Sequence, residues 1–234
     1  MASRPVFKAI DNEVGVDIRY IEFNYSSGFS LSQRLKSIKS LHENAAKQGY
    51  KNILEVSTKS PDELGISLSA FNLSAKTQKE EFEFTVERAF QASKVFENGG
   101  PYVDLLKKTS REAKKDVRLK NSGKIIKFIF YNYTFENNPP TFFYDWLYIN
   151  TLLKNADLID KLKNYDIFSD IEFNQNKSIN CQAYSLALFK SLLNNNILLE
   201  NLKDPKIFLE KTKNEYNKRW SKNNINSKRE LDLF

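Results

Sequence analysis

The sequence predicts a mainly helical α+β fold, a single domain built around a small β-sheet. Three observations lead to this prediction. Segments with apolar residues at helical spacing outnumber those with a strand-like pattern. The chain has 234 residues, of which 41% are apolar, and this is enough for one sizeable core. Phe and Tyr are abundant whereas Gly and Pro are scarce, which is typical of a packed protein and not of a linker.

The first 50 residues are expected to form an N-terminal elaboration of one strand and one helix, packed on the core. Residues 17–24 have the composition of a strand and lead into a turn. The segment that follows has apolar residues at helical spacing: Leu31, Leu35, Ile38 and Leu41. Ser30 or Ser32 is the expected N-cap of this helix, and Gly49 is its expected end.

The central region, residues 51–200, supplies the expected core. Strands or extended segments are predicted at 52–57, 66–74, 80–84 and 123–135. Helices are predicted from Thr85 to about 97, around 102–108, around 110–120, from Thr141 to about 164, and at about 181–193. Residues 201–234 are expected to form a basic C-terminal helix, at about 205–220, followed by a mobile tail beyond Trp220.

The formal charge of the chain is positive, since 36 basic and 29 acidic residues give +7. Such a balance favours the approach of a polyanion such as nucleic acid through long-range attraction. The chain is also rich in Lys, Asn and Ile, as proteins encoded by AT-rich genomes are. Base composition is therefore a second explanation of the charge, and both stay open at this point.

The sequence argues against a metal centre and against several cofactor sites. Cys181 is the only cysteine and His42 the only histidine, so neither a disulfide nor a Cys/His metal cluster can form within the chain. We expect Cys181 to be a buried inert thiol and His42 a surface or hydrogen-bonded histidine. The sequence contains no phosphate-binding loop, no dinucleotide-binding glycine pattern and no GxSxG element. We therefore expect neither metal nor cofactor.

The N-terminus and the hydropathy of the chain predict a cytoplasmic protein. The first residues lack a basic segment followed by an apolar run, which a secretory signal requires. The chain also lacks the roughly 18 consecutive apolar residues of a spanning helix. We therefore expect no membrane association, and a lone cysteine fits a reducing compartment.

The predicted helix that begins at Thr85 carries a polar stripe at spacings that share one face: Glu87, Gln91, Lys94 and Asn98. A carboxylate in the first turn of a helix is stabilised as the anion, which suits an ion that opposes a cationic transition state. The alternative is a solvated helix face with a weak Glu–Lys pair. The stripe alone does not decide between the two.

Three other segments have a functional and a structural interpretation each. Residues 68–72 (LSAFN) place a Ser, a Phe and an Asn where they could contact a ribose or a base, or they form a half-buried edge strand. Residues 168–183 place acidic and amide side chains before a helix, or they form an ordinary polar loop. The basic C-terminal segment contains Tyr216 and Trp220, which could stack on bases or dock the helix on the core.

These segments together resemble the NADAR superfamily. TVERAFQASKVF is similar to its helix signature, and LSAFN is similar to its LSNF-type segment, with Ala70 as a departure. EAKKDVR resembles the family's basic turn, and FSDIEFNQNKSINCQA resembles its Asp-containing loop and Asn-led helix, although the usual Trp-Gly is absent. The blocks stand in the family's order over about residues 52–193.

The resemblance implies a function that composition and spacing do not reach. The first 50 residues look like the elaboration of a subgroup that accompanies DarT-type DNA ADP-ribosyltransferase toxins. Membership implies an antitoxin N-glycosidase that removes ADP-ribose from guanine in nucleic acid, single-stranded DNA first. A cognate toxin is the second expected partner. The alternatives are an N-glycosidase of a small riboflavin-pathway intermediate and a non-catalytic protein that neutralises the toxin by contact.

The resemblance also assigns roles to individual residues. Glu87 is expected to stabilise an oxocarbenium-like centre or to deprotonate water, and Lys94 or Lys36 to hold a phosphate or form a Schiff base. Asp170 is the fourth catalytic candidate. The expected substrate-binding residues are Ser69, Phe71, Asn72, Phe90, Gln91, Lys114, Arg118 and Asn180, with Lys114 and Arg118 on the pyrophosphate and an aromatic ring on the base.

Overall fold

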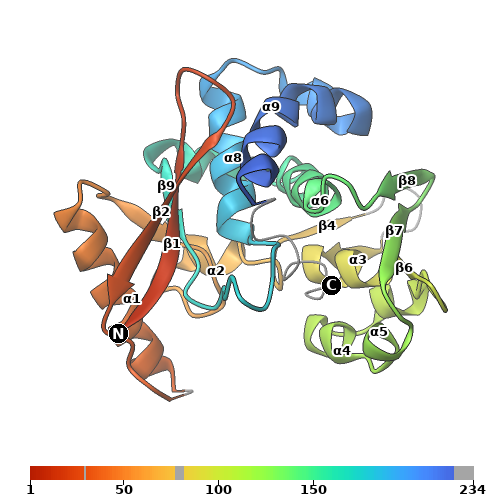
Figure 1. Ribbon diagram of the computed structural model, residues 1–234, viewed down its shortest axis with the longest axis horizontal. Coiled ribbons are helices and arrows are strands. Elements are labelled where there is room, and N and C mark those ends of the chain that lie inside the picture. Colours follow the sequence, from red (N-terminus) through yellow and green to blue (C-terminus); the bar gives the residue numbers. More distant parts are fainter. Residues whose placement is uncertain (29, 77–81, 224–234) are drawn as a thin grey trace.

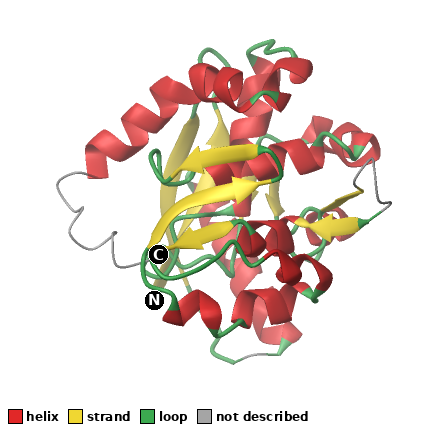
Figure 2. Cartoon of the chain, turned by 90° about the vertical axis from the view of Figure 1, so that its right-hand side faces the viewer, coloured by secondary structure: helices red, strands yellow, loops and turns green. Residues whose placement is uncertain are grey.

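The computed structural model describes residues 1–28, 30–76 and 82–223 and confirms a mainly helical α+β fold. The strands form three small sheets instead of one. Figure 1 shows the N-terminal strands and α1 on one side, β6–β8 with α3–α5 on the other, and α6, α8 and α9 between and above them. Seen from the side, helices surround the strands (Figure 2). The predicted mobile tail lies outside the described residues from 224 onward.

The largest sheet has four strands in the order β2–β1–β9–β3. Its members are β1 (Ala2–Ala9), β2 (Val16–Phe23), β3 (Ile53–Glu55) and β9 (Ile167–Ser169). β1 pairs antiparallel with β2 and β9, whereas β3 runs parallel to β9. The sequence patterns indicate β2 and β3 but neither β1 nor β9. The N-terminal elaboration thus contributes two strands to the sheet that carries β3.

Helix α1 (Leu31–Lys47) covers the N-terminal strands through a small apolar core. The Ser30 hydroxyl accepts a hydrogen bond from the Gln33 amide at 3.4 Å, so Ser30 is the N-cap. Gly49 follows the helix with a φ of 91°, which confirms it as the end signal. Ile38 and Leu41 point into the core with Phe23, as the helical spacing predicts.

The other two sheets lie beside the central helices. One pairs β4 (Ser74–Lys76) with β5 (Glu83–Thr85), and the other has the order β6 (Lys94–Phe96), β7 (Ile125–Phe130), β8 (Tyr133–Glu136). The sequence predicts one strand over 123–135, but the chain turns at Tyr131, whose φ is 51°, and forms a hairpin. The segment 66–74 is not a strand: α2 (Glu63–Ser67) and a turn occupy most of it.

Helices make up most of the remaining chain. They are α3 (Val86–Ala92), η1 (Val103–Lys107), α4 (Ser110–Lys115), α5 (Arg118–Asn121), α6 (Phe142–Leu152), α7 (Ala156–Lys161), η2 (Leu162–Asn164), α8 (Gln182–Asn194), η3 (Leu199–Lys203) and α9 (Pro205–Asn223). The long helix predicted from Thr141 is broken after α6, where the Asn155 amide donates to the Ser74 and Thr151 carbonyls at 2.9 Å each. The helix predicted over 110–120 is broken at Asp116.

The main core forms around α6 and α8, whose side chains are buried almost all the way round. Rings from β7, β8 and α6 pack against one another: the Phe128 and Phe143 rings are stacked with centroids 4.8 Å apart, and the Phe135 ring is tilted against Phe143 at the same distance. Complete burial of such a ring stabilises the fold by about 1.5–3 kcal/mol.

Helix α9 docks on this core. Its aromatic residues therefore pack the helix against the protein, the second of the two interpretations given above. Tyr216 is fully buried, and its hydroxyl donates to the Asp145 carboxylate at 3.1 Å. Trp220 packs against the same core, and the Arg219 guanidinium lies 3.8 Å from the Tyr184 ring centroid. These contacts fix the C-terminal helix to α6 and α8.

Candidate active site

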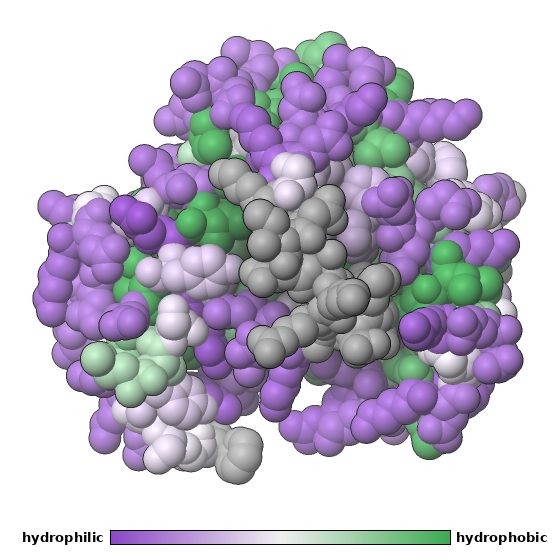
Figure 3. Space-filling model, in the orientation of Figure 1, coloured by the Kyte–Doolittle hydropathy of each residue, from purple (hydrophilic) through white to green (hydrophobic). Residues whose placement is uncertain are grey.

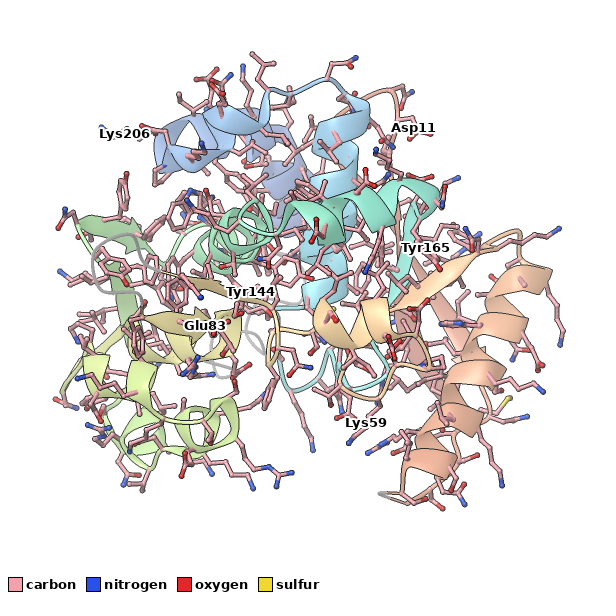
Figure 4. All side chains as sticks on the ribbon, turned by 180° about the vertical axis from the view of Figure 1, so that it is seen from behind. Asp11, Lys59, Glu83, Tyr144, Tyr165 and Lys206 are labelled. Atoms are coloured by element: carbon pink, nitrogen blue, oxygen red, sulfur yellow. The ribbon has the colours of Figure 1, made fainter. Side chains whose placement is uncertain are left out.

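A cavity of about 750 Å³ opens between the segments that the sequence analysis singled out. Its walls are the loop after β3, the segment before β4, α3, β6, α4 and the loop from β9 to α8. Tyr144 of α6, near the middle of the molecule, and Lys59, on a loop at the bottom of the view, both line it (Figure 4). The face seen in Figure 3 is mostly hydrophilic around the grey atoms. A cavity whose lining combines apolar surface with several convergent polar groups is the expected place for a ligand.

Helix α3 brings Glu87 to the cavity. The Thr85 hydroxyl caps the helix by accepting from the Arg88 amide at 3.3 Å, as predicted. The Glu87 side chain is only 5% exposed, and its Oε1 accepts a hydrogen bond from Gln91 Nε2 at 2.8 Å. Lys114 Nζ lies 3.8 Å from Glu87 Oε2. The helical spacing therefore correctly places Glu87 and Gln91 together.

Lys94 lines the same cavity but does not belong to the helix. Helix α3 ends at Ala92, where the Ser93 hydroxyl donates to the Ala89 carbonyl at 2.7 Å, and Lys94 begins β6. Its Nζ lies 4.7 Å from the Phe90 ring centroid. Burial lowers the pKa of Lys94 to about 8, while the nearby Glu87 carboxylate acts in the opposite direction. A fraction of this amine is therefore neutral near pH 8 and able to act as a nucleophile.

The LSAFN segment reaches the cavity with some of its residues only. Ser69 is buried and donates its hydroxyl hydrogen to the Ile66 carbonyl at 2.8 Å, and Phe71 lies with its ring centroid 5.1 Å from Lys114 Nζ. Asn72 is exposed, donates its amide to the Ile66 carbonyl at 2.9 Å and does not line the cavity. Asn72 thus holds the turn after α2 rather than a ligand.

Asp170 enters the cavity from the loop after β9. Its Oδ1 accepts hydrogen bonds from the Glu172 and Phe173 amides at 2.9 and 3.1 Å, and its Oδ2 accepts one from Gln182 Nε2 at 3.0 Å. Burial and, next, the negative charge of Glu55 raise the pKa of Asp170 to about 8. This carboxyl therefore holds its proton at neutral pH.

Two buried acceptors among the lining residues accept no hydrogen bond from the described part of the chain: Gln91 Oε1 and Asn180 Oδ1. The orientation of the Gln91 amide follows from its donation to Glu87, which leaves the oxygen for another partner. A buried unpaired acceptor costs free energy unless something donates to it. Both atoms are shielded from solvent in this structure, so a ligand with hydroxyl or N–H groups would pair with them only after the side chains turn toward the cavity.

Basic side chains outnumber acidic ones among the lining residues. The basic ones are Lys59, Lys94, Arg111, Lys114, Lys115 and Lys177, and the acidic ones are Glu87, Asp170 and Glu172. Helix α4 supplies three of these basic residues: Arg111, Lys114 and Lys115. The arrangement suits an anionic ligand such as a pyrophosphate.

Arg118 and Lys36, predicted as site residues, do not line this cavity. The Arg118 guanidinium is held by Asp104 and Asp116, with Nη2–Oδ2 at 2.6 Å and Nε–Oδ1 at 2.8 Å, and lies over the Tyr102 ring. It therefore stabilises the turn between α4 and α5. Lys36 is exposed on α1.

Gln182 is a site residue that the sequence analysis missed. It is the first residue of α8, and its Oε1 accepts from the Ala70 amide at 2.6 Å. Its Nε2 donates to the Val56 carbonyl at 2.6 Å as well as to Asp170. One amide thus joins three segments of the cavity wall. No local pattern indicates such contacts, because the partners are more than 100 residues away in the chain for Ala70 and Val56.

His42 and Cys181 have structural environments. The His42 Nε2 and Ser169 Oγ are hydrogen-bonded at 2.8 Å, which confirms a hydrogen-bonded histidine, and burial lowers the pKa of His42 to about 4. Cys181 is buried, and burial raises the pKa of its thiol. Within the described ranges, no group of three His, Cys, Asp or Glu side chains could hold a metal ion. Among the described helices, none has the length and apolar character needed to span a bilayer.

The comparison with protein families covers all of these segments. Residues 2–222 match the family described as DarT1-associated NADAR antitoxin. The chain belongs to this family. No curated protein matches the chain. The match includes the N-terminal strands and α1, and it supports a DarT-associated antitoxin role.

Proposed function

We propose that this NADAR antitoxin is an N-glycosidase that removes ADP-ribose from guanine bases of nucleic acid, single-stranded DNA first, in the cytoplasm. The observation that carries the proposal is the buried Glu87 carboxylate on the wall of a cavity that also contains Lys94 and Asp170. Removal of the base from ADP-ribose would reverse the modification made by a DNA ADP-ribosyltransferase toxin. The charge of +7 supports a polyanionic substrate.

The distribution of groups in the cavity suggests an orientation for ADP-ribose. The acceptors Glu87, Gln91 Oε1 and Asn180 Oδ1 suit the hydroxyl groups of the scissile ribose. The basic residues of α4, with Lys114 as the predicted one, suit the pyrophosphate, and Phe71 beside Lys114 offers a ring for a base. In this orientation the anomeric carbon lies near Glu87.

Glu87 acts twice in hydrolysis at that carbon. The bond between the anomeric carbon and the base nitrogen breaks, and its electron pair stays on the nitrogen, which takes up a proton. The positive charge that develops on the sugar is opposed by the Glu87 carboxylate. Water then adds to the anomeric carbon and gives a proton to Glu87, so that free ADP-ribose and unmodified guanine result.

Lys94 offers a covalent route that uses the same site. Its neutral amine attacks the anomeric carbon, the base leaves with a proton from the amine, and ring opening gives an imine with a free ribose hydroxyl. Water hydrolyses the imine to ADP-ribose and restores Lys94. The lowered pKa of Lys94 supports this route, because only the neutral amine is nucleophilic.

The proposal is tested by a substrate panel assayed in chelator: guanine-ADP-ribosylated single-stranded DNA, the same modification on RNA, and a phosphorylated riboflavin precursor. We expect free ADP-ribose from the modified nucleic acid and no cleavage of the precursor. Cleavage of the precursor alone would make the protein a small-molecule N-glycosidase. Protection from the toxin without any release would make it a neutralising binding protein.

A further inference from the structure

Glu55, the last residue of β3, is clamped to both neighbours of Asp170. Its Oε2 accepts a hydrogen bond from the Ser169 hydroxyl at 2.6 Å, and its Oε1 accepts one from the Ile171 amide at 2.8 Å. The Ser57 hydroxyl donates to Oε1 as well, at 2.7 Å. Because Ser169 and Ile171 flank Asp170 in the chain, this single carboxylate fixes the backbone on both sides of it.

The position of Glu55 is itself tightly determined. Its side chain is 1% exposed. Helix α2 packs directly on its backbone at Gly65, where an added Cβ would lie 1.9 Å from the Glu55 carbonyl oxygen. The close approach of α2 fixes the Glu55 backbone, and the three hydrogen bonds fix its carboxylate.

Two buried carboxyl groups whose charges act on each other cannot both ionise at low cost. Burial raises the pKa of Glu55 as well, but its three hydrogen bonds, two of them from hydroxyl groups, act in the opposite direction and favour its anion. Its negative charge in turn opposes ionisation of Asp170, which lines the cavity while Glu55 does not. The proton of the pair therefore resides on the carboxyl that a ligand can reach.

Other titratable groups around Asp170 do not replace this effect. The charge of Glu172, in the same loop, also raises the pKa of Asp170, but less than that of Glu55 does. Its side chain is 41% exposed and pairs with Arg34 at 3.2 Å. Burial raises the pKa values of the Cys181, Tyr144 and Tyr148 side chains, so these groups are neutral near Asp170. The charged residues that also line the cavity are Glu87, Lys59, Lys94, Arg111, Lys114, Lys115 and Lys177.

We propose that Glu55 is a positioning residue for Asp170: it directs the Asp170 side chain into the cavity and keeps it protonated, so that Asp170 gives the leaving base its proton. The inference rests on the proposed function. As the bond to the anomeric carbon breaks, the base nitrogen takes the Asp170 proton, and Asp170 becomes a carboxylate. The proton that Glu87 receives from water returns to Asp170 through solvent, which completes the cycle.

The same network gives the N-terminal elaboration a connection to the site. The Ser169 hydroxyl that donates to Glu55 is also hydrogen-bonded to His42 Nε2 on α1, at 2.8 Å. Because burial lowers the pKa of His42, this side chain is neutral and adds no charge near Glu55. Helix α1 thereby supports the Ser169–Glu55 contact.

The test compares pH profiles of kcat/KM for Glu55→Gln, wild type and the control Glu172→Gln. If Asp170 is the acid, activity falls as the pH rises through its pKa. Loss of the Glu55 charge should move this alkaline limb to lower pH by roughly one unit. Glu172→Gln should move it less, because the Glu172 charge has a smaller effect on the pKa of Asp170 and is exposed to solvent and paired with Arg34. An alkaline limb that stays in place in Glu55→Gln would overturn the proposal.

Two further measurements test the proposal if Glu55→Gln does not fold or if the protein shows no glycosidase activity. Ser169→Ala removes one hydrogen bond to Glu55 but keeps its charge, so kcat should fall while the limb stays; an unchanged kcat contradicts the positioning role. Carboxyl ¹³C NMR of the wild type reports the titration of Asp170 without a substrate. A titration near pH 8 supports the shared proton even if ADP-ribose release fails, and a titration near pH 4 overturns it.

Discussion

Replacement of Gln182 by Leu tests whether its amide holds the cavity walls together. The substitution keeps the volume of the side chain but removes three hydrogen bonds, to Ala70, Val56 and Asp170, of 2.6, 2.6 and 3.0 Å. Each such bond contributes about 0.5–1.5 kcal/mol net. We therefore expect the free energy of unfolding to fall by about 3 kcal/mol.

The matched control is Gln175→Leu in the neighbouring loop. Gln175 is partly buried and its Oε1 has no hydrogen-bond partner in the described part of the chain. Its replacement should change stability by less than about 0.5 kcal/mol. Urea denaturation measures both: a loss of about 3 kcal/mol moves the midpoint by roughly 1 M, with the m-value unchanged. Equal midpoints for the two variants would refute the reasoning.

Three other outcomes follow from the site and its surroundings. Burial lowers the pKa of His42 from 6.5 to about 4, so the unfolded state binds this proton first as the pH falls. The free energy of unfolding is therefore unaffected by this group above pH 6.5 and decreases by up to about 3 kcal/mol as the pH falls to 4. His42→Gln should flatten that part of a plot of Tm against pH, and wild-type and variant curves of the same slope would contradict this. If Lys94 forms an imine, borohydride added during turnover should trap an adduct in wild type and not in Lys94→Met; active wild type without an adduct leaves only the water route. Lys114→Met should reduce the slope of log affinity for modified single-stranded DNA against log salt by about 0.7, whereas Lys39→Met, at an exposed position on α1, should not; equal slopes would remove Lys114 from the phosphate contacts.

Local sequence signals were sufficient to predict the helices whose ends are marked by capping residues. Ser30, Gly49 and Thr85 mark helix ends because capping depends on a few adjacent residues. The fold class and the placement of Glu87 with Gln91 follow from periodicity in the same way. The expected function came from the resemblance to NADAR proteins, because the spacing of apolar residues does not indicate a reaction.

The elements that were missed depend on contacts between distant parts of the chain. β9 has three residues and becomes a strand because β1 and β3 flank it. Lys94 leaves the helix because β6 pairs with β7, about thirty residues later, and yet it still reaches the cavity. Strand pairing of this kind outweighs the helical pattern of TVERAFQASKVF.

The same limit applies to individual site residues. The basic turn suggested Arg118, but the sequence does not show that Asp104 and Asp116 occupy its guanidinium. Glu55 stands in the apolar run ILEV and looks like an ordinary strand residue until the fold brings Ser169 and Ile171 to it. Electrostatic partners far apart in sequence are therefore the part that only the structure supplies.

The central claim is that the Glu87 carboxylate is required for release of ADP-ribose. Its most direct test is the single-turnover rate of ADP-ribose release from guanine-ADP-ribosylated single-stranded DNA by wild type, Glu87→Gln and the control Glu172→Gln. We expect a loss of at least about a hundredfold for Glu87→Gln, with binding of the DNA retained, and less than about threefold for Glu172→Gln, whose carboxylate lines the same cavity but is exposed. Equal rates for wild type and Glu87→Gln would contradict the account.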